Sequence, residues 1–88
     1  MTATERSHHL QRAVVKTLRE VGGRLVPVDA VVASVGIKAD YLEPTRAEIF
    51  DAIAVVESRD RILGMTTETG KKYKITEAGE AWALEVKL

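Results

Sequence analysis

The sequence predicts an α+β domain in which three helices precede a β-hairpin and a fourth helix closes the fold. Apolar residues recur at helical spacing in three successive segments up to residue 58. Two short apolar segments then flank the glycine-containing stretch TTETGK, and a capped amphipathic segment follows them. With 88 residues, of which 45% are hydrophobic and 30% charged, the chain fits one domain with a single core.

The first helix is expected from about Ser7 to Val21. The residues that recur on its apolar side are Leu10, Ala13, Val14, Thr17, Leu18 and Val21. Gly22-Gly23 supplies the stop. Thr2, Thr4 and Ser7 are alternative N-caps, and Thr2 with Glu5 has the spacing of a capping box, so the start stays open.

A short extended piece is expected at Arg24 to Pro27, because a residue that precedes proline avoids the helical region. A short second helix then opens at Pro27 or Asp29 and ends at Gly36. Its buried face consists of Val28, Val31, Val32 and Val35. The seven residues Ile37 to Glu43 form a connection with a local apolar anchor at Tyr41-Leu42.

The third helix is predicted from Pro44 to Glu57 or Ser58. Pro44 suits the first helical position, and Thr45 with Glu48 offers a competing capping box one residue later. Apolar residues repeat at spacings of three and four, which predicts one buried face made of Ile49, Phe50, Ile53, Ala54 and Val56.

A polar turn at residues 59–61 leads into two strands, predicted at Ile62–Met65 and Lys72–Ile75 with a loop of four to six residues between them. Side chains alternate along a strand, so Tyr73 and Ile75 should face one side while Lys72 and Lys74 face water. Thr76 caps the last helix, whose residues closing over the core are expected to be Ala78, Ala81, Trp82 and Val86.

This order of elements, with an extended piece before the second helix, is that of the winged helix-turn-helix. The C-terminal part of the chain resembles the MarR and PadR-like winged-helix regulators, in which the hairpin commonly ends in Leu/Ile-Thr-x-x-Gly and enters a terminal helix. Ile75-Thr76-Glu77-Ala78-Gly79 matches that signature, within Ile62-Leu63-Gly64, TTETGKK and YKITEAGEAWALE. The resemblance spans roughly Ser7 to Leu88, and its specific part is the last quarter of the chain.

The resemblance implies a DNA-binding transcriptional regulator, and the lack of cysteines and of a signal peptide leads us to expect it in the cytoplasm. Its third helix would sit at the major groove of double-stranded DNA, and its wing at Thr66 to Lys72 would reach a neighbouring groove or phosphates. A homodimer would form through the first helix and the terminal segment Trp82 to Leu88, so that two modules cover two half-sites. One departure is the seven-residue connection before the third helix, because a standard helix-turn-helix turn has about 3–4 residues.

The formal charge is zero, but it is distributed unevenly along the chain. Glu43 to Ser58 carries one cation against four carboxylates, a net charge of −3. Arg59 to Ile75 carries five cations against two carboxylates, a net of +3, and Thr4 to Val21 has a net of +2. An acidic helix in the major groove would be repelled unless its carboxylates faced away.

Phosphate neutralisation supplies most non-specific affinity for DNA, so the basic hairpin and the first helix are the expected backbone contacts, with Lys71, Lys72 and Lys74 at the centre. Arg46 and Thr45 begin the third helix, where the helix dipole also favours phosphate. The predicted DNA-binding residues are therefore Thr45, Arg46, Arg59, Arg61, Lys71, Lys72 and Lys74.

Two other interpretations of these features stay open. Lysines on a hairpin also protect an exposed strand edge from pairing with other chains. The acidic third helix, together with the Tyr41-Leu42 loop, favours a winged-helix module that binds a protein partner and has little affinity for DNA. Recognition of single-stranded RNA is less favoured, because only four aromatic residues are present and the core needs them.

Catalytic, metal and membrane functions find little support in the sequence. The chain has no cysteine, which removes disulfides, thiolate zinc sites and a cysteine nucleophile. His8 and His9 are adjacent, and Glu5 with His9 gives only two ligands at helical spacing. No catalytic cluster or glycine-rich phosphate cradle is present, so we expect neither an enzyme nor a bound cofactor. No apolar run has the length of a signal peptide or membrane span.

Overall fold

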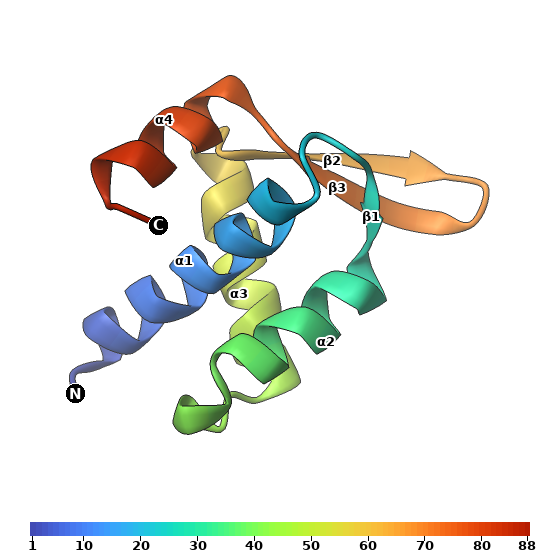
Figure 1. The fold of residues 1–88 in the computed structure, drawn as a ribbon. Helices are drawn as coiled ribbons and strands as arrows, with labels where there is room; N and C mark the ends of the chain where they lie inside the picture. Colours follow the sequence, from blue (N-terminus) through green and yellow to red (C-terminus); the bar gives the residue numbers. More distant parts are fainter.

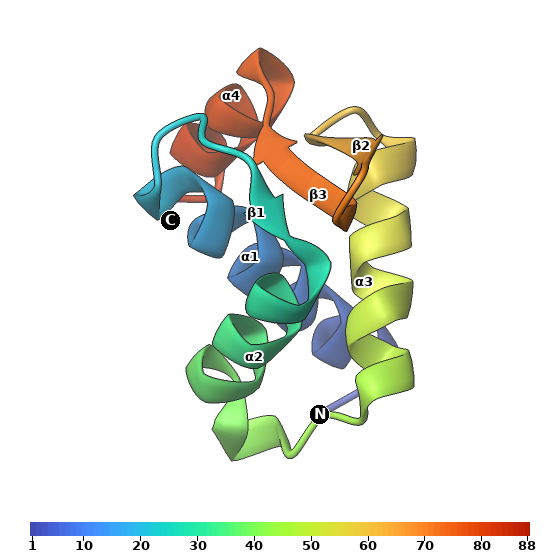
Figure 2. The same cartoon turned by 90° about the vertical axis from the view of Figure 1, so that its right-hand side faces the viewer.

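Four α-helices and a three-stranded antiparallel sheet make up the computed structural model, which describes residues 1–88 (Figure 1). The elements in chain order are α1 (Ala3–Glu20), β1 (Val26–Pro27), α2 (Val28–Lys38), α3 (Arg46–Ser58), β2 (Ile62–Thr67), β3 (Gly70–Ile75) and α4 (Glu77–Glu85). A 3-10 turn at Asp40–Leu42 joins α2 to α3. The predicted α+β class is confirmed, with β3 as the central strand between β1 and β2 (Figure 2).

Helix α1 begins four residues earlier than the expected start at Ser7. The Thr2 side chain accepts a hydrogen bond from the Glu5 backbone nitrogen at 3.1 Å, so the first of the alternative caps is the one used. The predicted apolar face is buried from Leu10 to Leu18, whereas Val21 follows the helix as its C-cap and is only half-buried. The face is broader than expected, because Gln11 and Val15 are buried as well. This breadth lets α1 contact α2, α3, α4 and β3.

Helix α2 continues through Gly36, so the predicted stop at that residue is wrong. Gly36 keeps a right-handed backbone, whereas a glycine that ends a helix usually turns left-handed. The helix instead ends at Lys38, and the Ala39 nitrogen donates to the Val35 carbonyl at 2.9 Å. The predicted valine face is confirmed, because Val31 and Val35 are fully buried and Val28 and Val32 pack against the core.

Helix α3 begins at Arg46, so the prediction that Pro44 is its first residue is wrong. The competing capping box forms in full: Thr45 accepts from the Glu48 nitrogen, and Glu48 accepts from the Thr45 nitrogen. The buried residues are Ile49, Ala52, Ile53 and Val56.

The expected burial of Phe50 and Ala54 in α3 is wrong, because both are exposed. Residues at i, i+3, i+4 and i+7 from Ile49 share one face of a helix with 3.6 residues per turn. Phe50 lies about 100° around the helix from Ile49, and Ala52 occupies the position between the buried isoleucines.

The hairpin strands are longer than predicted and their loop is shorter. Thr67 pairs with Gly70, which leaves a two-residue loop in place of the expected four to six residues. Gly70 has φ +114°, a conformation that side-chain-bearing residues rarely adopt. The pairing of Gly64 with Tyr73 and of Met65 with Lys72 confirms that Tyr73 and Lys72 lie on opposite faces.

The Ile-Thr-x-x-Gly signature fastens the start of α4 to the turn between α3 and β2. The Thr76 hydroxyl accepts from the Gly79 nitrogen at 3.0 Å and donates to the Asp60 carbonyl. The Thr76 nitrogen donates to the Arg61 carbonyl at 3.2 Å. A Cβ on Gly79 would lie 2.0 Å from that same carbonyl oxygen, so only glycine fits.

Helix α4 covers the core with residues other than the expected alanines. Gly79 and Ala83 are buried, whereas Ala78 and Ala81 are exposed. Trp82 is half-buried and packs against the edge of the core. The buried side of α4 differs from the predicted one because Gly79 lies against the Arg61 carbonyl, and this contact decides which side of the helix faces inward. No helix of the domain combines the length and apolarity needed to cross a membrane.

Candidate nucleic-acid interface

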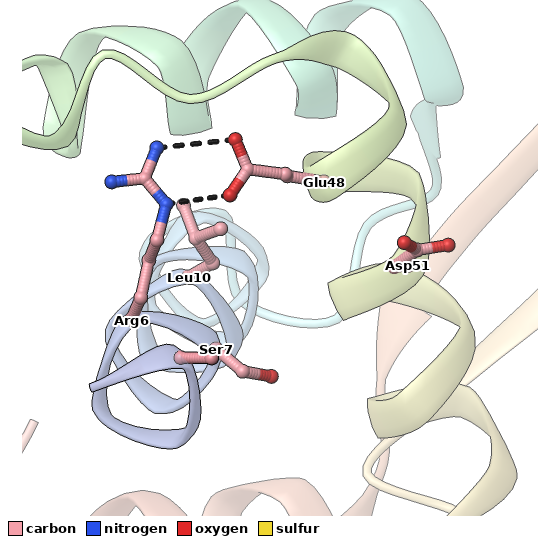
Figure 3. Close-up of a pocket in the computed structure, with 6 residues that line it drawn as sticks. Arg6, Ser7, Leu10, Glu48 and Asp51 are labelled. Carbon is pink, nitrogen blue, oxygen red and sulfur yellow. Dashed lines mark hydrogen bonds and ion pairs between the residues drawn. The ribbon is translucent and has the colours of Figure 1, made fainter.

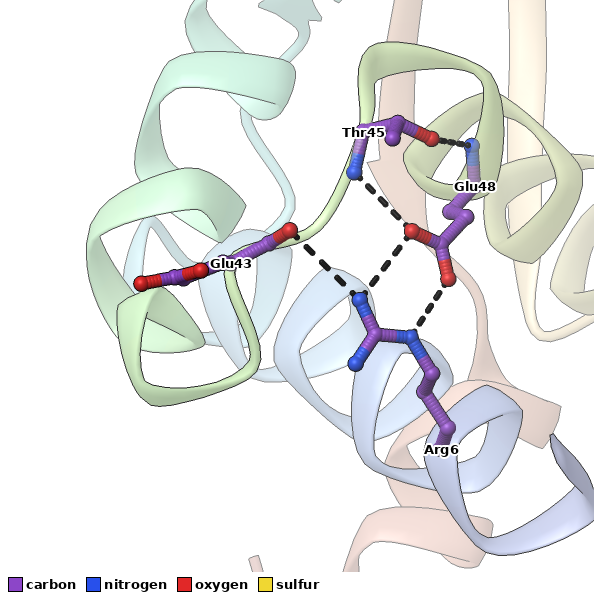
Figure 4. Close-up of polar contacts among 4 residues, drawn as sticks. All are labelled: Arg6, Glu43, Thr45 and Glu48. Carbon is purple, nitrogen blue, oxygen red and sulfur yellow. Dashed lines mark hydrogen bonds and ion pairs between the residues drawn. The ribbon is translucent and has the colours of Figure 1, made fainter. Parts of the chain in front are cut away.

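The first carboxylate of α3 is held by α1. Arg6 Nε lies 2.5 Å from Glu48 Oε2, and Arg6 Nη2 donates to Glu48 Oε1 at 3.1 Å (Figure 4). The hydrogen bonds from Arg6 and from the Thr45 backbone lower the pKa of Glu48 to about 2. Arg6 Nη2 also reaches the Glu43 carbonyl at 3.5 Å. Glu48 is therefore directed towards α1 and is charge-compensated within the domain.

The two remaining carboxylates of α3, Glu57 and Asp51, differ because only Glu57 makes an ion pair. Glu57 pairs with Lys71 of β3, with 3.7 Å between the carboxylate oxygen and Nζ. Asp51 lines a cavity of about 190 Å³ between α1 and α3, together with Arg6, Leu10 and Glu48 (Figure 3). Two of the three carboxylates within α3 are thus paired with cations of neighbouring elements.

The side of α3 opposite the core carries small side chains and one carboxylate, that of Asp51. Ala47, Ala54 and Ser58 are all exposed there, and Phe50 is 37% exposed beside them. These residues lie on the face opposite Ile49 and Val56 in a helix with 3.6 residues per turn. Small side chains allow the backbone of a partner molecule to approach the helix closely.

Thr45 and Arg46 occupy the N-terminal end of α3, as predicted. The Thr45 side chain is used by the capping box, although the residue remains exposed. Arg46 Nη2 lies 3.0 Å from Asp29 Oδ1, and its guanidinium lies 5.1 Å from the centre of the Phe50 ring. Because the Arg46 and Asp29 side chains are 64% and 81% exposed, a competing phosphate can reach Arg46.

The three lysines of the hairpin β2–β3 do not form one surface. Lys72 and Lys74 lie on the outer face of the sheet, opposite Met65 and Leu63 of β2, and neither makes an ion pair. Lys71 lies on the other face, 5.6 Å from the Tyr73 ring and close to Glu57. The outer-face lysines Lys72 and Lys74 are therefore the unpaired cations of the hairpin.

The other two predicted residues, Arg59 and Arg61, lie beside α1 and α4. They line a cavity with Arg12 and Trp82, and the Arg61 guanidinium lies 4.1 Å from the centre of the Trp82 ring. Burial, followed by repulsion from Arg59, lowers the pKa of Arg61. The seven predicted residues thus fall into three groups: the start of α3, the hairpin, and this arginine cavity.

Sequence reasoning missed Arg6 and Arg12, which act across elements far apart in the chain. Arg6 and Glu48 are 42 residues apart, so no local pattern signals their pairing. The positive charge of the first helix was the one signal that pointed towards Arg12. No protein-family model matches the sequence, and comparison with curated proteins and with solved structures gives no match.

Proposed function

We propose that the chain is a winged-helix DNA-binding protein that contacts duplex DNA through the outward side of α3 and the outer-face lysines of the hairpin. The order α1-β1-α2-α3-β2-β3-α4 supports this proposal, as does the strand order β1-β3-β2. The hairpin β2–β3 projects from the helical body, as a wing does (Figure 1).

The observation that carries the proposal is the pairing of two of the three α3 carboxylates within the domain. A net charge of −3 around this helix argues against DNA only if the carboxylates face the duplex. Glu48 is bound by Arg6, and Glu57 is paired with Lys71. The outward side of α3 then carries small residues and the single carboxylate of Asp51, with Arg46 at the N-terminal end of the helix, so one carboxylate in place of three would face the major groove.

Phosphate contacts would come from Lys72 and Lys74, which are free of ion pairs. As a transcriptional regulator the protein would act as a dimer, with α1 and α4 as the contact. Leu84 of α4 is 69% exposed and suits such an interface. Arg19 of α1 already binds Glu80 and the Leu88 carbonyl within the same chain, so the dimer contact would use the residues around them.

The experiment is a fluorescence-anisotropy titration of a mixed-sequence DNA duplex at several salt concentrations. The variant Lys72→Gln/Lys74→Gln removes two phosphate contacts, so the plot of log K against log salt should become shallower, with a slope less negative by about 1.8. Lys87→Gln is the control, because Lys87 is also a lysine without an ion pair but lies beyond α4. Equal slopes in all three proteins would overturn the assignment of the wing as a phosphate contact.

A second candidate function is protein binding at the corner between α2 and α3. Ile37 is 76% exposed and Tyr41 64% exposed, an unusual pair of apolar side chains for a solvent-facing turn. Tyr41 also contacts His9, with 3.3 Å between its hydroxyl and Nδ1. The replacement Ile37→Asp/Tyr41→Ser would abolish partner binding in this case and leave duplex affinity unchanged, whereas Lys72→Gln/Lys74→Gln would do the reverse.

A further inference from the structure

Three arginines of different elements line one cavity on the α1 and α4 side of the domain. Arg12 comes from α1, and Arg59 and Arg61 come from the turn between α3 and β2. The cavity has a volume of about 300 Å³, and its other lining residues include His8, Gln11 and Trp82. A volume at the lower end of the range for ligand sites suits a small molecule or a single charged group.

The charge in this cavity is uncompensated. None of the three arginines makes an ion pair, whereas Arg6, Arg19 and Arg46 each bind a carboxylate elsewhere in the domain. The lining residues include no aspartate or glutamate. Glu85 is the carboxylate that acts on Arg61 from nearby, and its effect is smaller than those of burial and of Arg59.

The position of Arg61 is fixed before any ligand arrives. Its guanidinium stacks over the Trp82 ring at 4.1 Å, and its carbonyl accepts from the Thr76 nitrogen at the start of α4. A stacked guanidinium loses less freedom on binding than a mobile one, and its planar fork matches the geometry of a phosphate group. Three guanidinium groups that line one cavity favour a partner with more than one negative charge.

We propose that this cavity binds a phosphate group, with Arg12, Arg59 and Arg61 as its ligands. The proposal is independent of the DNA-binding function proposed above, because it uses neither the outward side of α3 nor the outer-face lysines. The phosphate can belong to a small phosphorylated molecule or to the backbone of a nucleic acid. Both sources present the same doubly hydrogen-bonded oxygens to the arginines.

Trp82 is the only tryptophan of the chain, so its fluorescence reports on this cavity directly. The experiment titrates the protein with inorganic phosphate against sodium chloride at equal ionic strength and pH. We expect a saturable fluorescence change with a dissociation constant of about 1 mM or lower. We also expect a melting temperature that rises with phosphate and stays constant with chloride.

Two double variants and one control make the test specific. Arg12→Gln/Arg59→Gln should weaken phosphate binding about a hundredfold, on the basis of about tenfold for each lost charge-assisted hydrogen bond. Arg12→Lys/Arg59→Lys keeps the positive charge but loses the planar guanidinium groups. Its affinity for phosphate should therefore lie between those of the unchanged protein and of the glutamine variant. Arg24→Gln should bind as the unchanged protein does, because Arg24 is exposed, unpaired and outside the cavity. The three substituted residues, Arg12, Arg24 and Arg59, are exposed, so the variants should fold.

Duplex DNA then distinguishes the two sources of phosphate. If Arg12→Gln/Arg59→Gln also loses duplex affinity and the duplex competes with inorganic phosphate, the cavity takes a nucleic-acid phosphate. If duplex affinity is unchanged, the cavity takes a small phosphorylated molecule. The proposal is overturned if phosphate causes neither a saturable fluorescence change nor a rise in melting temperature, or if the glutamine variant binds phosphate as well as the unchanged protein.

Discussion

Replacing Gly79 by alanine should destabilise the domain although it places a better helix former in α4. A Cβ at this position would lie 2.0 Å from the Arg61 carbonyl oxygen and 2.8 Å from the Ile75 side chain. The nearer contact is with backbone, which cannot rotate away, so α4 must shift from the turn that Thr76 fastens it to. Overpacking of this kind costs about 1–3 kcal/mol and sometimes more, whereas alanine gains at most about 1 kcal/mol in helix propensity.

A backbone contact of 2.0 Å lies at the upper end of that cost, so the expected net loss for Gly79→Ala is about 2 kcal/mol of unfolding free energy, which lowers the melting temperature of a domain of this size by about 8–16 °C. Urea unfolding followed by circular dichroism at 222 nm measures it. Gly36→Ala is the matched control, because Gly36 is also helical and nothing lies within 4 Å of its added Cβ. That variant should gain about 0.5–1 kcal/mol. Equal stabilities for Gly79→Ala and the unchanged protein would refute the packing argument.

Three further changes test other contacts. Glu48→Gln keeps a capping side chain but removes the charge that Arg6 binds. The pKa of Glu48 in the folded domain is lowered to about 2, so the ion pair stabilises the domain above about pH 4.5. This stabilisation is lost as the pH falls towards 2. The melting temperature of Glu48→Gln should therefore be lower at pH 7, and the difference should shrink over that range. Thr76→Ala removes the cap of α4 and should cost about 0.5–2 kcal/mol in urea unfolding. Ala54→Glu should change unfolding free energy by less than about 0.5 kcal/mol, yet weaken duplex binding about tenfold in anisotropy titrations, because it adds a carboxylate to the outward side of α3.

The elements that local patterns specify were predictable from the sequence. N-caps depend on residues at fixed spacing, and the structure uses both predicted caps: Thr2 accepts from the Glu5 nitrogen, and Thr45 with Glu48 forms the complete capping box. Alternation along β3 likewise separated Tyr73 from Lys72 correctly. These features depend on neighbours within about one helical turn or one strand.

The features that the sequence did not predict depend on contacts between distant segments. Phe50 is apolar, but its face of α3 is decided by which residues α1 and the sheet cover. Gly36 did not end α2, because the helix could continue to Lys38 before the Asp40–Leu42 turn. The cation partners of α3 come from α1 and β3, so the charge count of α3 alone overstated the acidity of its outward side.

The candidate site likewise combines residues whose positions local patterns predicted with residues placed by contacts between distant segments. Thr45 and Arg46 lie at the start of α3, and the outer-face lysines lie on β3 of the hairpin. Arg59 and Arg61 lie in the arginine cavity because the α3–β2 turn packs against α4, a contact that Gly79 and Thr76 create. The sequence alone offered no means of separating these two groups of cations.

The most direct test of the proposed interface is a two-dimensional ¹H–¹⁵N NMR titration of the labelled protein with a DNA duplex at low salt. We expect the largest chemical-shift changes on the amides of Ala47, Ala54 and Ser58 of α3 and of Lys72 and Lys74 of β3. Shifts confined to Ile37 and Tyr41, or no shifts at the lowest salt, would contradict it.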